Sequence, residues 1–379
     1  MALYQQPTHL LKALSEREQN GQLRRLKSGF PIIDFCSNDY LGFSKLGLLA
    51  AKVHASPKHN ELALGSGGSR LTRGNSILMD EAEKQIALFH HAPAALLFNS
   101  GYDANLGLLA CVPQKNDLLL YDELVHPSLY DGIRLSQTTH YKFAHNDVHN
   151  LEELIHRHHK NYENIFVVVE SVYSMDGDTA PLLELVEICN ATKNIFLIVD
   201  EAHAIGVFGN QGRGLCNALG IEKRCFARIY TYGKALGCYG ASIVGSDILK
   251  NYLVNFSRTF IYTTALPDYS VNAILNAYQC LIETEQKDLL HSRIAYFYSQ
   301  TKHLTNLIKS QSAIHTLLIG SAQQTDKLLN DLSDHDFHVR AYKYPAVKEG
   351  RERIRISLHA FNSKQEMDAL LERILAFKF

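Results

Sequence analysis

Between Ser76 and Val244 the sequence alternates short apolar runs with longer stretches in which apolar residues recur at helical spacing. The short runs are apolar on both faces, which is typical of parallel strands covered by helices on both sides. Seven strands are predicted, at residues 94–98, 117–121, 140–143, 165–170, 195–200, 228–231 and 242–244. Helices are predicted between them, among others at residues 79–90, 151–159 and 182–192. The pattern predicts an α/β fold built on a large, mostly parallel seven-stranded sheet.

The length of the chain predicts more than one domain. Its 379 residues, 46% of them hydrophobic, suffice for a large domain carrying a smaller one. We expect an N-terminal helix and extended segment at 1–50, the large domain at 51–285 and a small C-terminal α+β domain at 286–379. Residues 267–309 contain almost no Gly or Pro and predict a long helical connector. Beyond it the pattern predicts a strand at 314–319, a helix at 325–332, a strand at 353–358 and a helix at 364–376.

Charge and cysteine content narrow the class of function. The 38 Lys and Arg residues nearly balance the 39 Asp and Glu residues, so no basic field attracts nucleic acid or anionic lipid. The N-terminal MALYQQPTHLLKALSER lacks the apolar core of a signal peptide, and no run is long enough to predict a membrane span. Seven scattered cysteines indicate reduced thiols in a cytoplasmic protein. We therefore expect small-molecule chemistry.

Polar residues end several of the predicted strands. In open α/β sheets the ligand crevice lies outside the carboxyl ends of the strands, so these residues are candidates for a site. They are Ser100 and Gly101 after AALLFN, Ser174 after FVVVESVY, Asp200 ending IFLIVD, and Thr231 with Lys234 in RIYTYGK. The segment NSGYDAN starts a helix directly after a strand, and a helix N-terminus suits a phosphate group.

Each of these residues also has an ordinary structural interpretation. Asp200 alone could be a helix cap or turn former, and NSGYDAN alone could be a tight turn. Lys234 could be a surface lysine in a glycine loop, but a partly desolvated lysine has a lowered pKa and becomes a nucleophilic amine. The stretch Gly65–Arg70 invites a dinucleotide-binding interpretation, which we reject because Arg70 stands where the third glycine belongs.

The histidines fall into two groups. His126 and His203 follow predicted strands, where a ring can stack on a planar cofactor or donate to a phenolic oxygen; a structural role is the alternative for each. The second group lies on polar helical faces, is expected to be solvated, and has no surrounding ligand framework that would predict a metal site. These are His90, His91, His156, His158 and His159.

Taken together, the motifs resemble the α-oxoamine synthases, a branch of the fold-type-I pyridoxal-5'-phosphate (PLP) enzymes. The similarity runs from SNDYLG at 37–42 to RIRISLHA at 353–360. In order between them stand GSGGSRLTRGN, FNSGYDAN, DELVHPSLYDGIRLS, ESVYSMDGD, VDEAHAIGVFG, TYGKALGCYGA and FIYTTALP. The resemblance implies a PLP-dependent transferase of fold type I that binds its cofactor in the large domain.

The resemblance also implies roles around the cofactor ring. Lys234 is expected to hold PLP as a Schiff base, and Asp200 to keep the pyridine nitrogen protonated. His126 would stack on the ring, while Ser174 and His203 would contact the phenolic oxygen. The expected catalytic side chains are Lys234, Asp200, His126 and His203. Ser174 is expected only to bind the cofactor.

Further matches concern the phosphate and the substrate. Ser100, the amides of Gly101 and Tyr102, and Thr231 are expected around the phosphate, and Thr264 of the partner subunit would reach it in a homodimer. The residues expected to bind the substrate are Asn38, Arg24 and Arg355, with Asn38 and Arg355 on its carboxylate.

The implied reaction is a decarboxylative condensation. Lys234 would remove the α proton of an amino acid, the carbanion would attack an acyl thioester, and loss of carbon dioxide would leave an α-amino ketone. Within the family, the resemblance carried by FCSNDYLGF, FAHNDVHNLEEL, MDGD and FARIYTYGKALGCYGA implies L-alanine with a pimeloyl thioester, carried by coenzyme A or a carrier protein, in biotin biosynthesis. DGIRLS leaves glycine with acetyl-CoA as an alternative, and another α-oxoamine synthase reaction is a further one.

Two residues depart from the commonest family pattern, Pro127 in VHPSL and Tyr232 in TYGK. They bear on the choice of acyl chain and leave the chemistry intact.

A non-catalytic PLP-binding module is a hypothesis of another class. Such a module would be expected to lose the lysine or to gain a DNA-binding segment, whereas this sequence keeps Lys234 and has no basic helix-turn-helix extension.

Overall fold

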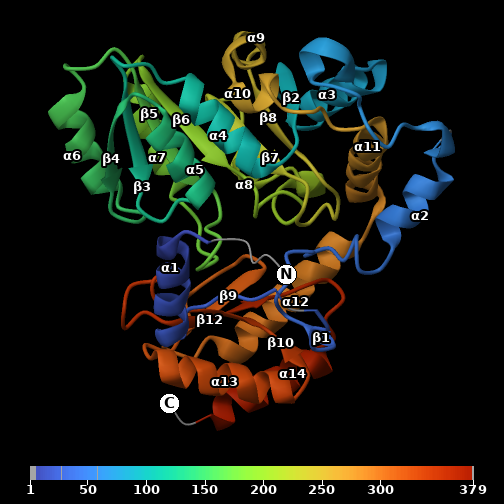
Figure 1. Cartoon of the computed structure of the whole chain (residues 1–379), viewed down its shortest axis with the longest axis vertical. Coiled ribbons are helices and arrows are strands. Elements are labelled where there is room, and N and C mark those ends of the chain that lie inside the picture. The colour runs from blue at the N-terminus through green and yellow to red at the C-terminus, as the bar shows by residue number, and fades with distance from the viewer. Residues whose placement is uncertain (1–5, 27, 58, 378–379) are drawn as a thin grey trace.

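The computed structural model describes residues 6–26, 28–57 and 59–377, and Figure 1 shows how they are arranged. A seven-stranded sheet with the order β2-β8-β7-β6-β5-β3-β4 forms the centre of the larger part. Its strands are β2 (Ala94–Phe98), β3 (Leu118–Asp122), β4 (Thr139–Phe143), β5 (Ile165–Glu170), β6 (Ile195–Asp200), β7 (Ala227–Thr231) and β8 (Ala241–Gly245). Neighbours from β7 to β4 are parallel, whereas β8 runs antiparallel to β2 and β7. The predicted mostly parallel sheet is confirmed.

Alternate residues of the central strands enter different layers of the core. In β5, Val167 packs with residues of α6 (Val148–His158) and α7 (Leu182–Ala191). Its neighbour Val168 packs with residues of α4 (Gly101–Cys111) and α5 (Pro127–Leu135) on the other face. All six residues of β5 are buried, which explains why the run is apolar on both faces. The remaining helices of this part are α3 (Ile77–Phe89), α8 (Leu215–Ala218), α9 (Asp247–Phe256) and α10 (Arg258–Ile261).

The C-terminal part contains a three-stranded antiparallel sheet of order β11-β12-β9. Its elements are β9 (Ile314–Leu318), α13 (Ala322–Asp334), β11 (Arg340–Tyr342), β12 (Arg353–Ser357) and α14 (Lys364–Ala376). The predicted strand–helix–strand–helix order is therefore present, with β11 added. A short parallel pair joins β1 (Ile33–Asp34) to β10 (Phe337–His338) and so attaches the N-terminal segment to this part. The division at residues 50 and 285 stays a prediction.

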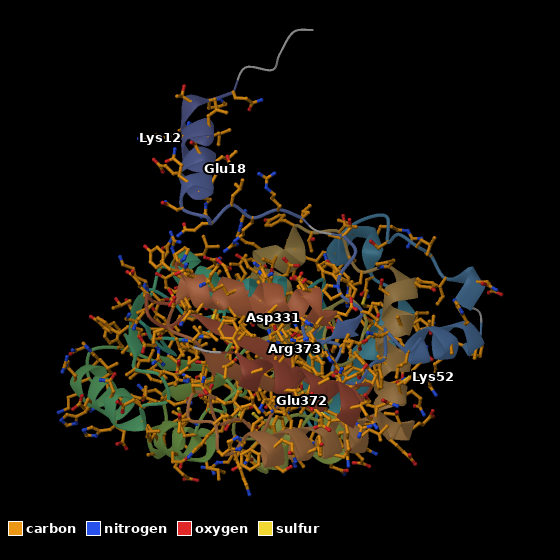
Figure 2. All side chains as sticks on the ribbon, turned by 90° about the horizontal axis from the view of Figure 1, so that it is seen from below. Lys12, Glu18, Lys52, Asp331, Glu372 and Arg373 are labelled. Atoms are coloured by element: carbon orange, nitrogen blue, oxygen red, sulfur yellow. The ribbon has the colours of Figure 1, made fainter. Side chains whose placement is uncertain are left out.

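The long connector predicted at 267–309 is divided into two helices, α11 (Asp268–Glu283) and α12 (Gln286–Thr301). Thr284 ends α11 because its backbone is extended, with φ −95° and ψ 150°. Next to α11 lies α2 (Leu48–Ala55). The N-terminal α1 (Thr8–Gln19) buries no residue, and Figure 2 shows it standing clear of the body with Lys12 and Glu18 in solvent.

The expectation that His90 is solvated is wrong. Its side chain is only 1% exposed, because the ring stacks on Tyr230 at a centroid distance of 3.7 Å. His90 Nε2 also lies 2.9 Å from the Tyr278 hydroxyl, which satisfies one nitrogen in the core. The aromatic partners come from β7 and α11, far away in sequence, so the polar residues next to His90 in the sequence did not predict its burial.

Among the described helices, none is long and apolar enough to cross a membrane.

Candidate active site

A cavity of about 310 Å³ opens at the carboxyl ends of β5, β6 and β7, beside the N-terminus of α4. Parallel strands place their last residues along one edge of the sheet, so side chains far apart in sequence meet there. The cavity is lined by Asn38, Ser100, Gly101, Tyr102, Asn105, His126, Ser128, Glu170, Asp200, Ala202, His203, Thr231, Gly233, Lys234, Tyr239 and Gly240. Most of the predicted site residues are thus brought together.

Asp200 is the last residue of β6 and is 3% exposed. Its Oδ2 accepts a hydrogen bond from Asn105 Nδ2 at 2.8 Å, and its Oδ1 accepts one from the backbone N–H of Ala202 at 2.9 Å. Asn105 Nδ2 also donates to the Ser128 hydroxyl, which lies 2.7 Å from His126 Nδ1. One polar network therefore fixes Asp200 and His126 on the same cavity.

Lys234 follows β7 and lines the cavity with Asp200. Burial lowers the pKa of the Lys234 amine, while the negative charges of Asp200 and Glu170 oppose the shift and Arg355 adds to it. A lysine with a lowered pKa carries a larger fraction of the neutral, nucleophilic amine near neutral pH. The structure therefore supplies the environment predicted for Lys234.

Burial favours the neutral ring of both candidate histidines. Burial lowers the pKa of His126, and burial together with the nearby positive charges of Lys234 and Arg355 lowers the pKa of His203 well below its ordinary value. His203 Nδ1 lies 2.7 Å from the Tyr40 hydroxyl. That contact occupies one ring nitrogen and leaves Nε2 as the atom that could bind a ligand.

The N-terminus of α4 forms a cradle for an anion. Ser100 caps the helix, since its hydroxyl accepts from the Asp103 backbone N–H at 3.1 Å and donates to the Asp103 carboxylate at 2.7 Å. A side chain at Gly101 would clash, because an added Cβ would lie 2.3 Å from Thr231 Cγ2. The Thr231 hydroxyl is buried and has no hydrogen-bond partner among the described residues. The amides of Gly101 and Tyr102 at this helix N-terminus and the unpaired Thr231 hydroxyl are suitable for a phosphate.

Arg355 lies on β12 of the C-terminal part and is 6% exposed. Its Nη2 donates to Asn38 Oδ1 at 2.5 Å and to the Tyr40 hydroxyl at 3.2 Å, while its buried Nε has no partner among the described residues. Asn38 lines the cavity. The guanidinium is thus anchored through Nη2 at the edge of the site, and its Nε remains available as a donor, as expected of a group that binds a carboxylate.

Besides Arg355, three predicted residues lie outside the cavity lining. Ser174 is half-buried in the loop after β5, and Arg24 is exposed in the segment between α1 and β1. Thr264 is exposed, and its carbonyl oxygen accepts from Asn99 Nδ2 at 2.8 Å. The roles assigned to these three residues stay predictions.

Sequence reasoning missed Glu170, Asn105 and Tyr40. Glu170 ends the apolar run IFVVVE in the same way that Asp200 ends IFLIVD, so the signal used for Asp200 could have found it. Asn105 lies inside α4 and Tyr40 in SNDYLG, and nothing local marks either as a partner of the site. Only the fold brings Asn105 to Asp200 and Tyr40 to His203.

The residues present fit PLP. The unpaired Thr231 hydroxyl and the space kept by Gly101 suit the phosphate, and Asp200 presents a carboxylate for a protonated ring nitrogen. Lys234 supplies the amine. Among the described residues, no group of three or more His, Cys, Asp or Glu side chains could hold a metal ion.

A family model described as aminotransferase class I and II matches residues 31–374. The chain belongs to this family. An 8-amino-7-oxononanoate synthase from Emericella nidulans is 39% identical over 376 residues, covering 90% of this chain and 88% of the relative. The predicted membership of the α-oxoamine synthase branch is confirmed.

Two solved structures extend the similarity to the whole fold. The 8-amino-7-oxononanoate synthase of Francisella tularensis has a TM-score of 0.78 at 29% identity, covering 90% of this chain and 96% of that one. Serine palmitoyltransferase from S. paucimobilis, solved with a bound PLP–myriocin aldimine, has a TM-score of 0.86 at 25% identity and covers 97% and 96%. The predicted fold of a fold-type-I PLP transferase is confirmed.

Proposed function

We propose that the chain is a PLP-dependent acyltransferase of biotin biosynthesis that condenses L-alanine with a pimeloyl thioester. The products are 8-amino-7-oxononanoate, carbon dioxide and a free thiol. The observation that carries the proposal is the cavity that holds Lys234 and Asp200 together, in a chain whose relatives are named 8-amino-7-oxononanoate synthase.

PLP is the cofactor, and when bound it supplies an electron sink for negative charge at the α carbon of an amino acid. Lys234 would hold it through Nζ, and Asp200 would hold a proton at the ring nitrogen. The first-turn amides of α4 and the Thr231 hydroxyl would bind its phosphate. Since the pKa of Lys234 is lowered, its Nζ can also accept the α proton of the amino acid near neutral pH.

The substrate carboxylate is assigned to Arg355 and Asn38. Arg355 Nη2 donates a hydrogen bond to Asn38 Oδ1, and the unpaired Nε gives Arg355 a further donor. A guanidinium matches the planar geometry of a carboxylate, so it can orient the amino acid as well as hold it. Arg24 is proposed as a further substrate-binding residue on the resemblance alone.

Substrate identity is tested by a competition assay of the purified protein. L-Alanine, glycine and L-serine are each paired with pimeloyl, acetyl and palmitoyl thioesters, and kcat/KM is measured for each pair. Alanine with the pimeloyl thioester should exceed glycine with acetyl-CoA by at least about ten-fold. Some activity with glycine is expected, because one methyl group contributes only about 1–3 kcal/mol of discrimination. A preference for glycine with acetyl-CoA, or for the palmitoyl thioester, would contradict the proposal.

The working form is proposed to be a cytoplasmic homodimer with sites shared between subunits. Exposed aromatic side chains near the cavity and Thr264 support an interface, with Tyr239 61% and Tyr262 71% exposed. All seven cysteines are free thiols, as expected in a reducing compartment. If Thr264 of the partner subunit completes the site, mixing Lys234→Ala and Thr264→Ala proteins should restore activity above that of either alone. A fully active monomer in sedimentation at assay concentration would exclude the shared site.

A further inference from the structure

Glu170 is a cavity residue that the proposed mechanism does not use. It is the last residue of β5 and pairs in register with Asp200 at the end of β6, so two carboxyl groups stand side by side at the edge of the sheet. Its side chain is 2% exposed and lines the cavity with Lys234. The Oε1 atom is buried without a hydrogen-bond partner among the described residues. Such an atom is costly to keep unless a ligand in the cavity pairs with it.

The surroundings of Glu170 differ from those of Asp200. Asp200 accepts two hydrogen bonds through its two oxygens, from Asn105 and from the backbone of Ala202. Burial raises the pKa of Glu170 well above its ordinary value, and the neighbouring charge of Asp200 raises it further. Lys234 opposes the shift, as do the hydrogen-bonding backbone N–H groups. A neighbouring buried carboxylate therefore favours the protonated form of the Glu170 carboxyl group.

Glu170 also connects two segments of the pocket. The backbone N–H groups of His126 and Ser174 face its carboxyl group and act to lower its pKa. His126 caps α5, and Ser174 belongs to the loop that follows β5. These segments carry the side chain expected to stack on the ring and one of those expected at the phenolic oxygen, so a single carboxyl group faces the backbone of both.

We propose that Glu170 is a positioning residue that works as a neutral carboxyl group. It accepts the N–H groups of the His126 and Ser174 segments and leaves its other oxygen as a hydrogen-bond donor at the cavity wall, toward the bound cofactor. The inference rests on the proposed function, because it assumes PLP in this cavity. It assigns to Glu170 a task opposite to that of Asp200, which must carry a negative charge.

Three substitutions separate this role from other possibilities. Glu170→Gln keeps the size, the neutrality and both kinds of hydrogen bond, so its dissociation constant for PLP should stay within about three-fold of the unaltered value. Glu170→Leu removes every polar contact and should weaken PLP binding by about ten-fold or more. Glu170→Asp withdraws the carboxyl group from the two N–H groups and should weaken binding as well. Glu184→Gln, at an exposed position on α7, is the matched control.

The measurements are PLP uptake by the apoprotein and the visible absorbance of the loaded protein from pH 5 to 8. The groups that face Glu170 are Asp200 from β6, Lys234 after β7, and the N–H groups of His126 and Ser174. Because Glu170 stays neutral, the unaltered protein and Glu170→Gln should show the same absorbance profile. A transition in the unaltered protein that Glu170→Gln lacks would overturn the neutral carboxyl group.

The relative PLP affinities of the three variants decide whether Glu170 acts as a positioning residue. If Glu170→Leu binds PLP as tightly as the unaltered protein, Glu170 positions nothing. If Glu170→Leu does not fold, as judged by circular dichroism of the apoprotein, the Gln and Asp variants still decide the matter. Retained binding in Glu170→Asp with loss in Glu170→Gln would show that a charged carboxylate is needed, which is against the proposal. Failure of the unaltered protein to bind PLP would instead refute the proposed function itself.

Discussion

Two histidines follow neighbouring strands of the large sheet, β4 and β3, and their surroundings shift their pKa values in opposite directions. His145 lies between two carboxylates, with Nδ1 2.9 Å from Asp122 and Nε2 2.7 Å from Asp178, which raises its pKa to about 10 despite partial burial. His126 instead has the Ser128 hydroxyl at its Nδ1, and burial lowers its pKa. Both rings follow strands of one sheet, so their immediate partners decide their charge.

The surroundings of the two histidines also differ in where their unpaired polar atoms lie. Around His145, the side chain and backbone of Asn146 add hydrogen bonds to Asp178 and Asp122, and the ring packs edge-on against Tyr173. In the cavity, the Thr231 hydroxyl and Glu170 Oε1 have no partners among the described residues. Asn146 Oδ1 and Asp178 Oδ1 are also buried without partners among the described residues, but these two residues lie outside the cavity lining. Unpaired groups on the wall of a cavity, by contrast, indicate a place for a ligand.

Removing the amine should produce the largest difference between the two regions. Lys234→Ala should lower kcat by at least about 10²–10⁴-fold, the contribution of a positioned general base, while PLP still binds through the phosphate and ring contacts. Steady-state kinetics and PLP titration check this. Lys84→Ala, on the exposed face of α3, serves as the control, and near-normal turnover in Lys234→Ala would remove that residue from the chemistry.

The next largest effect is expected from Asp200, whose negative charge the account requires. Asp200→Asn keeps the shape but not the charge, so it should bind PLP yet exchange the α proton of alanine about 10²-fold more slowly. Exchange is followed by NMR in deuterated water, with Asp288→Asn at an exposed position of α12 as the control. An unchanged exchange rate would show that the charge is not used.

Substitution of Arg355 tests whether the substrate-binding site includes a residue of the C-terminal part. Hydrogen bonds to charged groups contribute about 1.5–3 kcal/mol, so Arg355→Ala should weaken alanine binding by about 10- to 150-fold. PLP binding should be unaffected. The exposed Arg351→Ala is the control. Loss of thermal stability with unchanged alanine affinity would mean that Arg355 only supports the fold.

His145 should affect stability and leave catalysis nearly intact. Its folded pKa, about 10, lies above the unfolded value of about 6.5, so its contribution is complete below pH ~6.5 and is lost as the pH rises through 10. His145→Gln should therefore lower the free energy of unfolding by about 2 kcal/mol at pH 6, and by less at pH 9. Denaturant unfolding at both pH values tests this, with the exposed His149→Gln as the control. A loss that grows with pH would contradict the charged state.

The sequence predicts those parts of the molecule that depend on local pattern. The run IFVVVE is apolar on both faces because helices cover both sides of β5, and the same argument located the other six strands. The end of α11 at Thr284 was not predictable, because nothing in the local sequence interrupts the helical pattern. The two-residue pairing of Ile33–Asp34 with Phe337–His338 has no periodic signal either.

The same limit applies to the candidate site. Residues that end strands, such as Asp200 and Thr231, were recognisable because the strand pattern places them at the crevice. The residues that hold them in place were not, since Asn105 contacts Asp200 across 95 positions and Tyr40 contacts His203 across 163. His90 shows the converse, because distant aromatic residues bury a side chain whose local context is polar.

Lys234 is the residue that we propose holds the cofactor. The most direct test is to load the purified protein with PLP, reduce it with sodium borohydride and locate the pyridoxyl group by peptide mapping. We expect one modified peptide, carrying the group on Lys234 in the segment TYGKALG. A pyridoxyl group on any other lysine, or a protein that takes up PLP without covalent attachment, would contradict it.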